Sequence, residues 1–405
     1  MIPSILFLYN APEDSLPVLM SKAIALTKTE EAFKIVHKII AIACENNYAA
    51  GNLWHNYLTH LILSNENPFS LASERREAPE GSLMDFALHD FEIFRKLFRL
   101  SDSDLSLAYI KDFRGICANS LIPSLSLQLS NANSADEFCK IVSAFYKRYG
   151  VGIFAFNRAF RLGSNSLIPV PNKNIGDVNF DDIVGYEIQK NELISNTKAF
   201  LEGRPANNVL LYGDGGTGKS TSIKALLNEF FADGLRVVEI YKHQFRDILR
   251  LTESLRRRNY KFIIFIDDLS FEENEIEYKY LKAVIEGGIE TKPDNVLIYA
   301  TSNRRHIIRE NWSDRDDMEH NGDIHRSDTV EEKLSLASRF GIAINYSSPT
   351  RKEYHEIVLK LAEKSGLDVD INALIKGSDT WELRHGGMSG RTAKQYIDYK
   401  LGVEN

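Results

Sequence analysis

Hydrophobic residues recur at helical spacing through the first part of the chain. Two stretches, Glu31–Asn46 and Met84–Leu100, place apolar side chains every three or four residues, which predicts an amphipathic helix in each. The apolar stripes are Phe33, Val36, Ile39 and Ile40 in the first stretch and Ala87, Phe91, Phe94 and Phe98 in the second. Ser134-Ala-Asp-Glu137 has the spacing of a capping box ahead of the apolar run Phe138–Tyr149. We therefore predict a mostly helical N-terminal domain over residues 1–165, with an interaction or regulatory role.

The segment that follows is predicted to be extended. Ile153-Phe-Ala-Phe156 and Leu167-Ile-Pro-Val170 have the pattern of short strands or of an extended connector. Pro171–Asn179 is mostly polar and includes Gly176, a composition typical of linkers. We accordingly place a linker at residues 166–180.

A different pattern begins after the linker. Short apolar runs alternate with amphipathic segments, which predicts a parallel sheet with helices on both faces. The predicted strands are Val209–Tyr212, Arg236–Ile240, Phe262–Ile266, Val296–Ala300 and Ile342–Tyr346. The pattern then becomes helical again in Arg351–Ser365 and Gly390–Leu401. We expect an α/β domain over residues 181–348, followed by a small helical lid over residues 349–405.

Composition is that of an ordinary globular protein. The chain has 405 residues, of which 43% are hydrophobic and 26% are charged, enough for two or three packed domains. Its formal net charge of -7 gives no overall reason to expect nucleic-acid binding. The three cysteines lack Cys-x-x-Cys spacing, and the sequence shows neither a signal peptide nor a long apolar span. We therefore expect a cytoplasmic protein that does not enter a membrane.

One segment has the spacing of a phosphate-binding P-loop, the Walker A motif. Gly213-Asp-Gly-Gly-Thr-Gly-Lys-Ser220 matches Gly-x4-Gly-Lys-Ser and lies between a predicted strand and a predicted helix, as the motif requires. Glycines let backbone N–H groups turn toward phosphate oxygens, and a helix N-terminus adds positive potential. We expect Lys219 to reach the β- and γ-phosphates of ATP and the Ser220 hydroxyl to hold Mg²⁺. The nucleotide-binding residues expected here are Gly213, Asp214, Gly215, Gly216, Thr217, Gly218, Lys219, Ser220 and Thr221.

A buried strand that ends in two acids complements this loop. Phe262-Ile-Ile-Phe-Ile-Asp-Asp268 has the pattern of a Walker B strand. We expect Asp267 to hold Mg²⁺, mostly through water. Asp268 is placed to orient or deprotonate the attacking water. The alternative is a pair of strand-end acids that cap a neighbouring helix.

With these motifs in hand, the chain resembles the AAA+ ATPases, a class of P-loop NTPases. Asp181-Asp-Ile-Val-Gly185 resembles their adenine-packing segment, which implies nucleotide contacts from Ile183 and Val184. Val296–Asn303 resembles the sensor 1 strand, with Asn303 directed at the γ-phosphate. The resemblance also implies an arginine finger at Arg339, in Ser338-Arg-Phe340, and a sensor 2 residue at Arg391, in Ser389-Gly-Arg391.

The resemblance narrows to one bacterial ATP-binding family, domain of unknown function 815, over residues 150–405. The segments that carry it are Gly185–Lys190, Pro205–Tyr212, Ile266–Phe271, Tyr299–His306 and Leu334–Gly341. This family implies a fold and ATP binding without a settled biological role.

Two positions depart from the AAA+ pattern. Asp268 stands where most of these ATPases have Glu, and its shorter side chain is expected to slow hydrolysis. Met388 precedes the sensor 2 segment where a polar or basic residue is usual. The two arginines also have simpler alternatives. Arg339 would then pair with a surface carboxylate, and Arg391 would lie on the surface at a helix N-terminus.

An arginine finger ties activity to assembly. An arginine supplied in trans stabilises the charge on the transferred phosphoryl group and raises the rate by factors of about 10³–10⁵. We therefore expect a homo-oligomer joined through ATP-bridged interfaces. Arg304 and Arg305, which follow the sensor 1 strand, are rival finger candidates ranked below Arg339.

Weaker signals lie in two charged segments. Arg256-Arg-Arg258 ends a predicted helix, where a solvated last turn is the default and a phosphate-backbone contact is the alternative. Glu310–Asp328 is a charge-dense loop, which we expect to become ordered on nucleotide binding or assembly. The histidines in or near it, His306, His320 and His325, lack metal-ligand spacing.

The leading hypothesis is an ATP phosphohydrolase that remodels or loads a partner macromolecule, a protein or a nucleic acid. Leu255–Lys261 lacks the glycine of the pore loop of threading unfoldases, which disfavours that class. The main alternative is an ATP-gated clamp or loader that acts on DNA or on a DNA-bound protein with little turnover. A small-molecule kinase is a third hypothesis, which the sensor 1 strand and Arg391 disfavour.

Overall fold

The computed structural model describes residues 6–9, 29–77, 79–100, 110–115, 121–164, 166–271, 275–286, 293–303, 336–367 and 369–404. The chain divides into two units, Met1–Phe156 and Asn157–Asn405. None of the helices in these described ranges combines the length and the apolar character needed to cross a bilayer.

The N-terminal unit is built from α-helices around one apolar core. Its helices are α2 (Thr29–Glu45), α3 (Leu53–Ser64), α4 (Pro68–Glu74), α5 (Ser82–Phe98), α6 (Leu121–Ser130), α7 (Ala135–Tyr149) and α8 (Ile153–Phe156). Helix α3 packs against α2 and α6, while α7 packs against α4 and α5. The predicted helical character of this region is confirmed.

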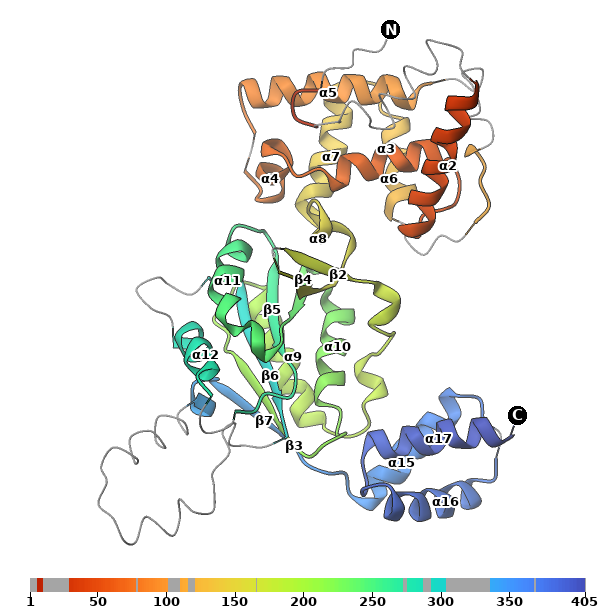
Figure 1. Cartoon of the computed structure of the whole chain (residues 1–405), viewed down its shortest axis with the longest axis vertical. Coiled ribbons are helices and arrows are strands. Elements are labelled where there is room, and N and C mark those ends of the chain that lie inside the picture. Colours follow the sequence, from red (N-terminus) through yellow and green to blue (C-terminus); the bar gives the residue numbers. More distant parts are fainter. Residues whose placement is uncertain are drawn as a thin grey trace. The chain divides into compact units, whose positions relative to one another are not determined.

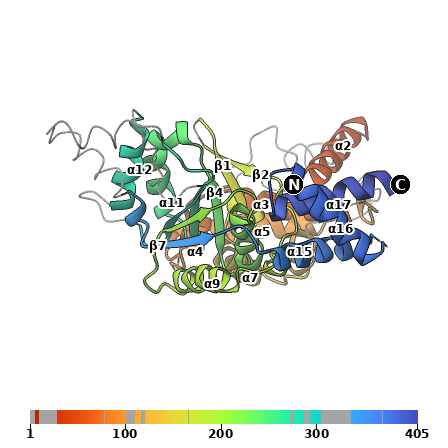
Figure 2. The same ribbon diagram turned by 90° about the horizontal axis from the view of Figure 1, so that it is seen from below.

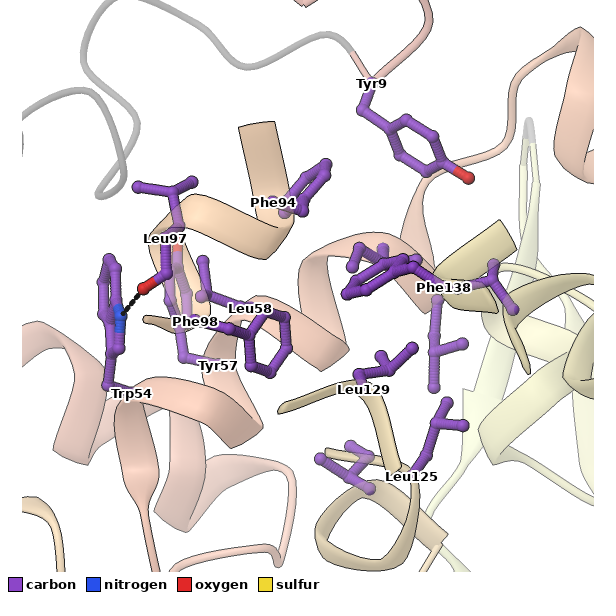
Figure 3. Packing of buried hydrophobic residues seen from close by; sticks show 14 of the residues in the cluster. Tyr9, Trp54, Tyr57, Leu58, Phe94, Leu97, Phe98, Leu125, Leu129 and Phe138 are labelled. Carbon is purple, nitrogen blue, oxygen red and sulfur yellow. Dashed lines mark hydrogen bonds between the residues drawn. The ribbon is translucent and has the colours of Figure 1, made fainter. Parts of the chain in front are cut away.

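Aromatic side chains dominate the core of this unit (Figure 3). The indole Nε1 of Trp54 donates a hydrogen bond of 2.9 Å to the carbonyl oxygen of Leu97, which ties α3 to α5. The rings of Phe91 and Phe138 lie 5.4 Å apart between centroids and join α5 to α7. Each large apolar side chain buried in this way contributes roughly 1.5–3 kcal/mol to folding.

The predicted helix stripes are mostly buried. All four residues of the second stripe are buried, namely Ala87, Phe91, Phe94 and Phe98. In the first stripe Val36 and Ile39 are buried, whereas Phe33 is 49% exposed. The predicted capping box is half formed. Ser134 Oγ accepts the N–H of Glu137, but the Glu137 carboxylate accepts the N–H of Asn133 instead of that of Ser134.

A seven-stranded sheet organises the second unit (Figure 1). Its strands are β1 (Ala159–Leu162), β2 (Leu167–Val170), β3 (Val209–Gly213), β4 (Leu235–Glu239), β5 (Lys261–Ile266), β6 (Val296–Ser302) and β7 (Ile342–Tyr346). Their order is β2-β1-β4-β5-β6-β3-β7. Only β1 and β2 pair antiparallel among these neighbours, and the other pairs are parallel. All five predicted strands are present, and the predicted α/β architecture is confirmed.

Helices cover both faces of this sheet. Helices α9 (Glu187–Leu201) and α10 (Lys219–Phe230) pack on one face, where Leu193 and Leu226 share a core with Val209 and Leu211 of β3. Helix α11 (Ile248–Arg256) packs against β6, and α12 (Glu277–Glu286) packs against α11. Because the central strands are buried on both faces, their sequences are continuously apolar.

The segment that joins the two units agrees with the prediction in part, since Leu167–Val170 forms strand β2. Ile153–Phe156 forms helix α8, not a strand, since a short apolar run does not by itself distinguish the two. Strands β1 and β2 extend the sheet beside β4, so the predicted linker at residues 166–180 begins with a strand of the second unit. Pro169 lies in the edge strand β2, where a missing N–H costs no ladder bond.

Three helices form the C-terminal lid, and they lie together in both views (Figures 1 and 2). They are α15 (Arg351–Lys364), α16 (Ile371–Arg384) and α17 (Gly390–Glu404). Thr350 and Glu353 form a reciprocal capping box at the start of α15. The lid has its own core, made of Tyr354, Ile357, Val358, Ala362, Leu374, Ala393, Tyr396 and Ile397.

Candidate nucleotide-binding site

The P-loop Gly213–Ser220 joins the carboxyl end of β3 to the first turn of α10. Strand β6 is the neighbour of β3, and β5 is the next strand beyond it. Because these strands are parallel, residues that follow β5 and β6 share one sheet edge with the loop, where α/β proteins bind their ligands. Asp267, Asp268 and Asn303 lie at this edge.

Glycines permit the course of the loop. Gly213, Gly216 and Gly218 have φ angles of 127°, 77° and 97°, in the left-handed region that other residues rarely adopt. A side chain at Gly213 would clash with the carbonyl oxygen of Tyr346. A Cβ at Gly215 would meet no atom within 4 Å, so the backbone there borders open space.

Lys219 lies under the loop with its ammonium group surrounded by oxygen atoms. Its Nζ donates to the carbonyl oxygens of Gly213 and Asp214 at 2.9 and 2.5 Å. It also donates to Oδ1 of Asn303, at the end of β6, at 3.2 Å. Burial lowers the pKa of the Lys219 ammonium, and the Asp214 carboxylate opposes that shift. Two predicted site residues, Lys219 and Asn303, are thus in direct contact.

Ser220 and Asp267 meet although they come from different elements. The Ser220 hydroxyl donates to Oδ1 of Asp267 at 2.6 Å. The Thr301 hydroxyl, from β6, donates to the same Oδ1 atom at 2.5 Å. The two residues predicted to hold Mg²⁺ therefore present their oxygen atoms at one point.

Asp268 has an unusual backbone conformation. Its φ angle is +51°, which Asp and Asn adopt more readily than other non-glycine residues. Its N–H donates to the Thr301 hydroxyl at 2.9 Å, and its carboxylate accepts Nδ2 of Asn303 at 2.8 Å. The Asp268 carboxylate is therefore bonded to Asn303, whereas the Asp267 carboxylate is bonded to Ser220.

Thr301 is a site residue that our sequence analysis missed. Its hydroxyl contacts Asp267 and Asp268 together, and its side chain is buried. The signal in the sequence was the pair of small hydroxyl residues, Thr301 and Ser302, that ends a buried strand. Buried polar groups are nearly always hydrogen-bonded, so such a residue has a partner to be found.

These residues fit a magnesium–nucleotide complex. Ser220 and Asp267 offer hydroxyl and carboxylate oxygens, the ligand types that Mg²⁺ prefers. The glycine-rich turn and the N-terminus of α10 offer backbone N–H groups and positive potential to phosphate oxygens. Lys219 adds a positive charge at the same place.

Most of this chain matches the model of one protein family. The family model described as "Protein of unknown function (DUF815)" matches residues 153–404. The chain belongs to this family.

The DUF815 protein is also similar to curated proteins over part of its length. The 26S proteasome regulatory subunit 6B homolog of Aspergillus niger is 27% identical over 222 residues, or 49% of this chain and 48% of that protein. The Schizosaccharomyces pombe homolog is 25% identical over 230 residues, or 50% of this chain and 54% of its own length. The chain thus spans about half the length of the curated relatives that it matches. Together with its P-loop and its parallel sheet, these similarities identify the second unit of the DUF815 protein as an AAA+ P-loop domain.

Solved structures of low similarity were also found. The RuvB Holliday junction branch migration motor of Thermotoga maritima matches with a TM-score of 0.38 and 19% identity, over 55% of this chain and 64% of that chain. A mutant RuvB from the same organism matches with a TM-score of 0.39 and 18% identity, over 57% and 68% of the two chains.

The predicted adenine-packing segment of the DUF815 protein lies between the P-loop and the lid. Ile183 is buried, and its Cγ2 would lie 3.6 Å from a Cβ built on Gly218. Val184 packs against the core of the lid. Just before them, Lys360 donates to the carbonyl oxygen of Asp181. Lid and loop therefore both border this segment.

Arg391 lies in the first turn of α17 and reaches the P-loop. Its backbone N–H donates to the carbonyl oxygen of Gly216 at 3.3 Å. The positive charge of Arg391 adds to burial in lowering the pKa of Lys219. Met388 packs against the apolar core of the lid, which explains an apolar residue at that position.

The two predicted threonines of the nucleotide site have different surroundings. The Thr217 hydroxyl donates a hydrogen bond to the carbonyl oxygen of Asp214, while Thr221 is half-buried in the first turn of α10.

Arg339 is not brought to the P-loop of its own chain. It precedes β7, which pairs with β3 in parallel so that Ile342 lies beside Val209 and Tyr346 lies beside Gly213. Arg339 is therefore at the opposite edge of the sheet from the loop. The rival arginines, the charge-dense segment and its histidines lie outside the described residues, namely Arg304, Arg305, His306, Glu310–Asp328, His320 and His325.

Proposed function

We propose that this DUF815 protein binds Mg-ATP at the P-loop and hydrolyses it to ADP and phosphate. The observation that carries the proposal is the 2.6 Å contact between Ser220 Oγ and Asp267 Oδ1. This contact joins the P-loop, whose N–H groups can bind phosphate oxygens, to the end of β5, whose carboxylate can bind a metal ion. Bound Mg²⁺ would be held by Ser220 and Asp267 and would neutralise charge on the phosphate oxygens.

The remaining polar residues then have distinct roles. Lys219 binds the β- and γ-phosphates and is held under the loop by carbonyl oxygens. Asp268 orients a water molecule for in-line attack and accepts its proton, and Asn303 holds that carboxylate in place. Ile183 and Val184 pack against the adenine. The contact of Asn303 with both Lys219 and Asp268 supports a coordinated set rather than separate surface groups.

Assembly into a homo-oligomer completes this site. Arg339 lies at the sheet edge opposite the P-loop, so a role in phosphoryl transfer requires the P-loop of a second copy. Arg391, whose N–H is bonded to Gly216 of the same chain, would contact the γ-phosphate of the nucleotide bound by its own P-loop. We infer that ATP bridges neighbouring copies and that the cycle remodels or loads a partner macromolecule, bound by the helical N-terminal unit.

An ATP-gated clamp with little turnover is the second candidate. Asp268 supports it, because its side chain is shorter than the usual Glu and is already bonded to Asn303. The variant of this candidate that uses Arg256–Arg258 on DNA is less favoured, since Arg256 and Arg257 already pair with Glu253 at 3.1 and 4.0 Å.

Steady-state hydrolysis separates these candidates. Purified protein with ATP and Mg²⁺ should release phosphate, and Lys219→Ala should not. An ATPase is supported by turnover that depends on Lys219, whereas the clamp is supported by tight ATP binding without measurable turnover. Equal turnover by Lys219→Ala and the wild type would show that the site is wrongly assigned.

A further inference from the structure

Asp214 has the wrong charge for a residue that binds phosphate, although it is the second residue of the P-loop. Its Oδ2 atom accepts two hydrogen bonds from Ser348, one from the backbone N–H at 2.7 Å and one from the hydroxyl at 2.8 Å. These bonds lower the pKa of the Asp214 carboxyl and keep it ionised. The side chain is therefore committed to Ser348 rather than to a nucleotide.

Ser348 lies where the chain passes from the sheet to the lid. It comes two residues after Tyr346, the last residue of β7, and two before Thr350, the N-cap of α15. The N–H of Asp214 adds a third bond, to the carbonyl oxygen of Tyr346 at 3.0 Å. We call residues 346–350 the hinge. Asp214 is thus bonded to two residues of the hinge, Tyr346 and Ser348.

The other side of Asp214 contacts the phosphate-binding machinery. Its carbonyl oxygen accepts the Lys219 ammonium at 2.5 Å and the Thr217 hydroxyl at 2.9 Å. The backbone and the carboxylate of one residue therefore contact the phosphate-binding lysine and the hinge. Any movement of Lys219 or of the loop around a bound nucleotide acts directly on the group that holds Ser348.

The lid contacts the same loop a second time. A Cβ on Gly216 would lie 2.9 Å from the Cβ of Arg391 and 3.0 Å from Ser389 Oγ. This close approach leaves room only for glycine, and it depends on the angle at which the lid leaves the sheet. The hinge contact at Ser348 and the contact at Gly216 both depend on that angle, as does the ion pair between Lys364 of the lid and Asp182.

We propose that Asp214 is a positioning residue that couples the P-loop to the lid. Its carboxylate holds the hinge at Ser348 and thereby keeps Arg391 against Gly216, so that nucleotide in the loop and lid orientation stabilise each other. This inference rests on the proposed nucleotide binding and adds to it a route from the phosphates to the lid.

Amide hydrogen exchange of the full-length protein tests this coupling. Exchange of the hinge, residues 346–350, is measured without nucleotide and with Mg²⁺ and a non-hydrolysable ATP analogue, whose affinity is measured by calorimetry. The variants are Asp214→Asn, which keeps the shape and removes the charge, and Ser348→Ala, which removes one of the two donors. Asp233→Asn is the matched control, because Asp233 is exposed in the turn before β4.

In the wild type, nucleotide should slow exchange of the hinge. In Asp214→Asn, loss of a charged acceptor should speed nucleotide-free exchange by about tenfold and abolish most of the slowing by nucleotide. By reciprocity the affinity of Asp214→Asn for the analogue should fall modestly, by up to about fivefold, because binding no longer gains from the held lid. Ser348→Ala should give a smaller change in the same direction, and Asp233→Asn should match the wild type.

Two results would overturn the coupling alone. One is slowing by nucleotide in Asp214→Asn that equals the wild-type slowing. The other is loss of nucleotide binding by Asp214→Asn, which would make Asp214 a binding residue instead. A wild-type protein that binds no nucleotide would overturn the proposed function as well, and calorimetry distinguishes that result from the other two.

Discussion

The hydroxyl of Ser220 and the carboxylate of Asp267 are 2.6 Å apart, although 47 positions separate them in the sequence. Ser220 lies in the first turn of helix α10, and Asp267 follows strand β5, two strands away from the P-loop strand β3. Only a parallel sheet with β6 between β5 and β3 brings them to the same edge. This contact underlies the predictions that follow.

The variant Asp268→Asn should bind ATP normally but hydrolyse it slowly. The amide keeps the size of the side chain and tolerates the φ angle of +51°, so the fold should be unchanged. It lacks the negative charge needed to accept a proton, so phosphate release should slow by at least about 10²-fold. ATP affinity should remain within about threefold of the wild type, because Ser220 and Asp267 are intact.

A phosphate-release assay and calorimetry on the same preparation check this prediction. Asp233→Asn makes the same change of charge at an exposed position and should behave as the wild type does. Full turnover by Asp268→Asn would remove Asp268 from the chemical step and leave the water to another group.

Thr301→Val should weaken both the fold and the magnesium site. Valine has nearly the same shape but lacks the hydroxyl that bonds Asp267 and the N–H of Asp268. The partly buried N–H of Asp268 then loses its acceptor, which should lower the free energy of unfolding by about 1 kcal/mol. The Asp267 carboxylate also loses a donor that orients it, so the affinity for Mg²⁺ in the presence of nucleotide should fall.

Urea unfolding and a magnesium titration measure the two effects. Thr301→Ser is the matched variant, because it keeps the hydroxyl and loses only a methyl group. It should retain magnesium affinity near that of the wild type. If the valine variant binds Mg²⁺ as well as the serine variant, the Thr301 hydroxyl does not orient Asp267.

Arg339→Ala should inactivate a neighbouring site rather than its own. The two variants Arg339→Ala and Asp268→Asn should each hydrolyse ATP poorly when pure. Mixed oligomers combine the intact P-loop and acids of the first with the intact Arg339 of the second. Activity should therefore reappear on mixing, and it should grow with protein concentration as oligomers form.

A mixture of two variants that both lack part of the P-loop site provides the control. Lys219→Ala mixed with Asp268→Asn should remain inactive, because neither copy supplies a complete P-loop with its acids. If Arg339→Ala alone is fully active, or if its mixture with Asp268→Asn stays inactive, Arg339 does not act in trans.

The sheet and the P-loop were predictable from the sequence for a physical reason. Strands buried on both faces are continuously apolar, and the backbone of a phosphate loop restricts the residue type at Gly213, Gly216 and Gly218. Strand burial and loop backbone conformation each restrict the residue types of a short segment, so both can be recognised in the sequence. Lys219 and Asn303 were each predicted to face the γ-phosphate, and the structure brings the two side chains into contact at the same sheet edge.

The features that escaped prediction depend on distant partners. Thr301 and Ser348 are ordinary polar residues until the fold brings them to Asp267 and Asp214. The short run Ile153–Phe156 has an apolar pattern that suits a helix or a strand equally, and it folds as helix α8. The pattern of Leu167–Val170 predicts a short strand or an extended connector, and it forms strand β2, but its pairing with β1 does not show in the sequence.

Calorimetric titration of ATP with Mg²⁺ into the protein measures nucleotide binding at the P-loop, on which every role proposed above depends. The wild type and Lys224→Ala, an exposed lysine on the same helix as Lys219, should bind with equal affinity. Lys219→Ala should bind at least about 100-fold more weakly, because it lacks the charged donor to the phosphates. Wild-type protein that gives no heat of binding, or Lys219→Ala that binds as the wild type does, would contradict the account.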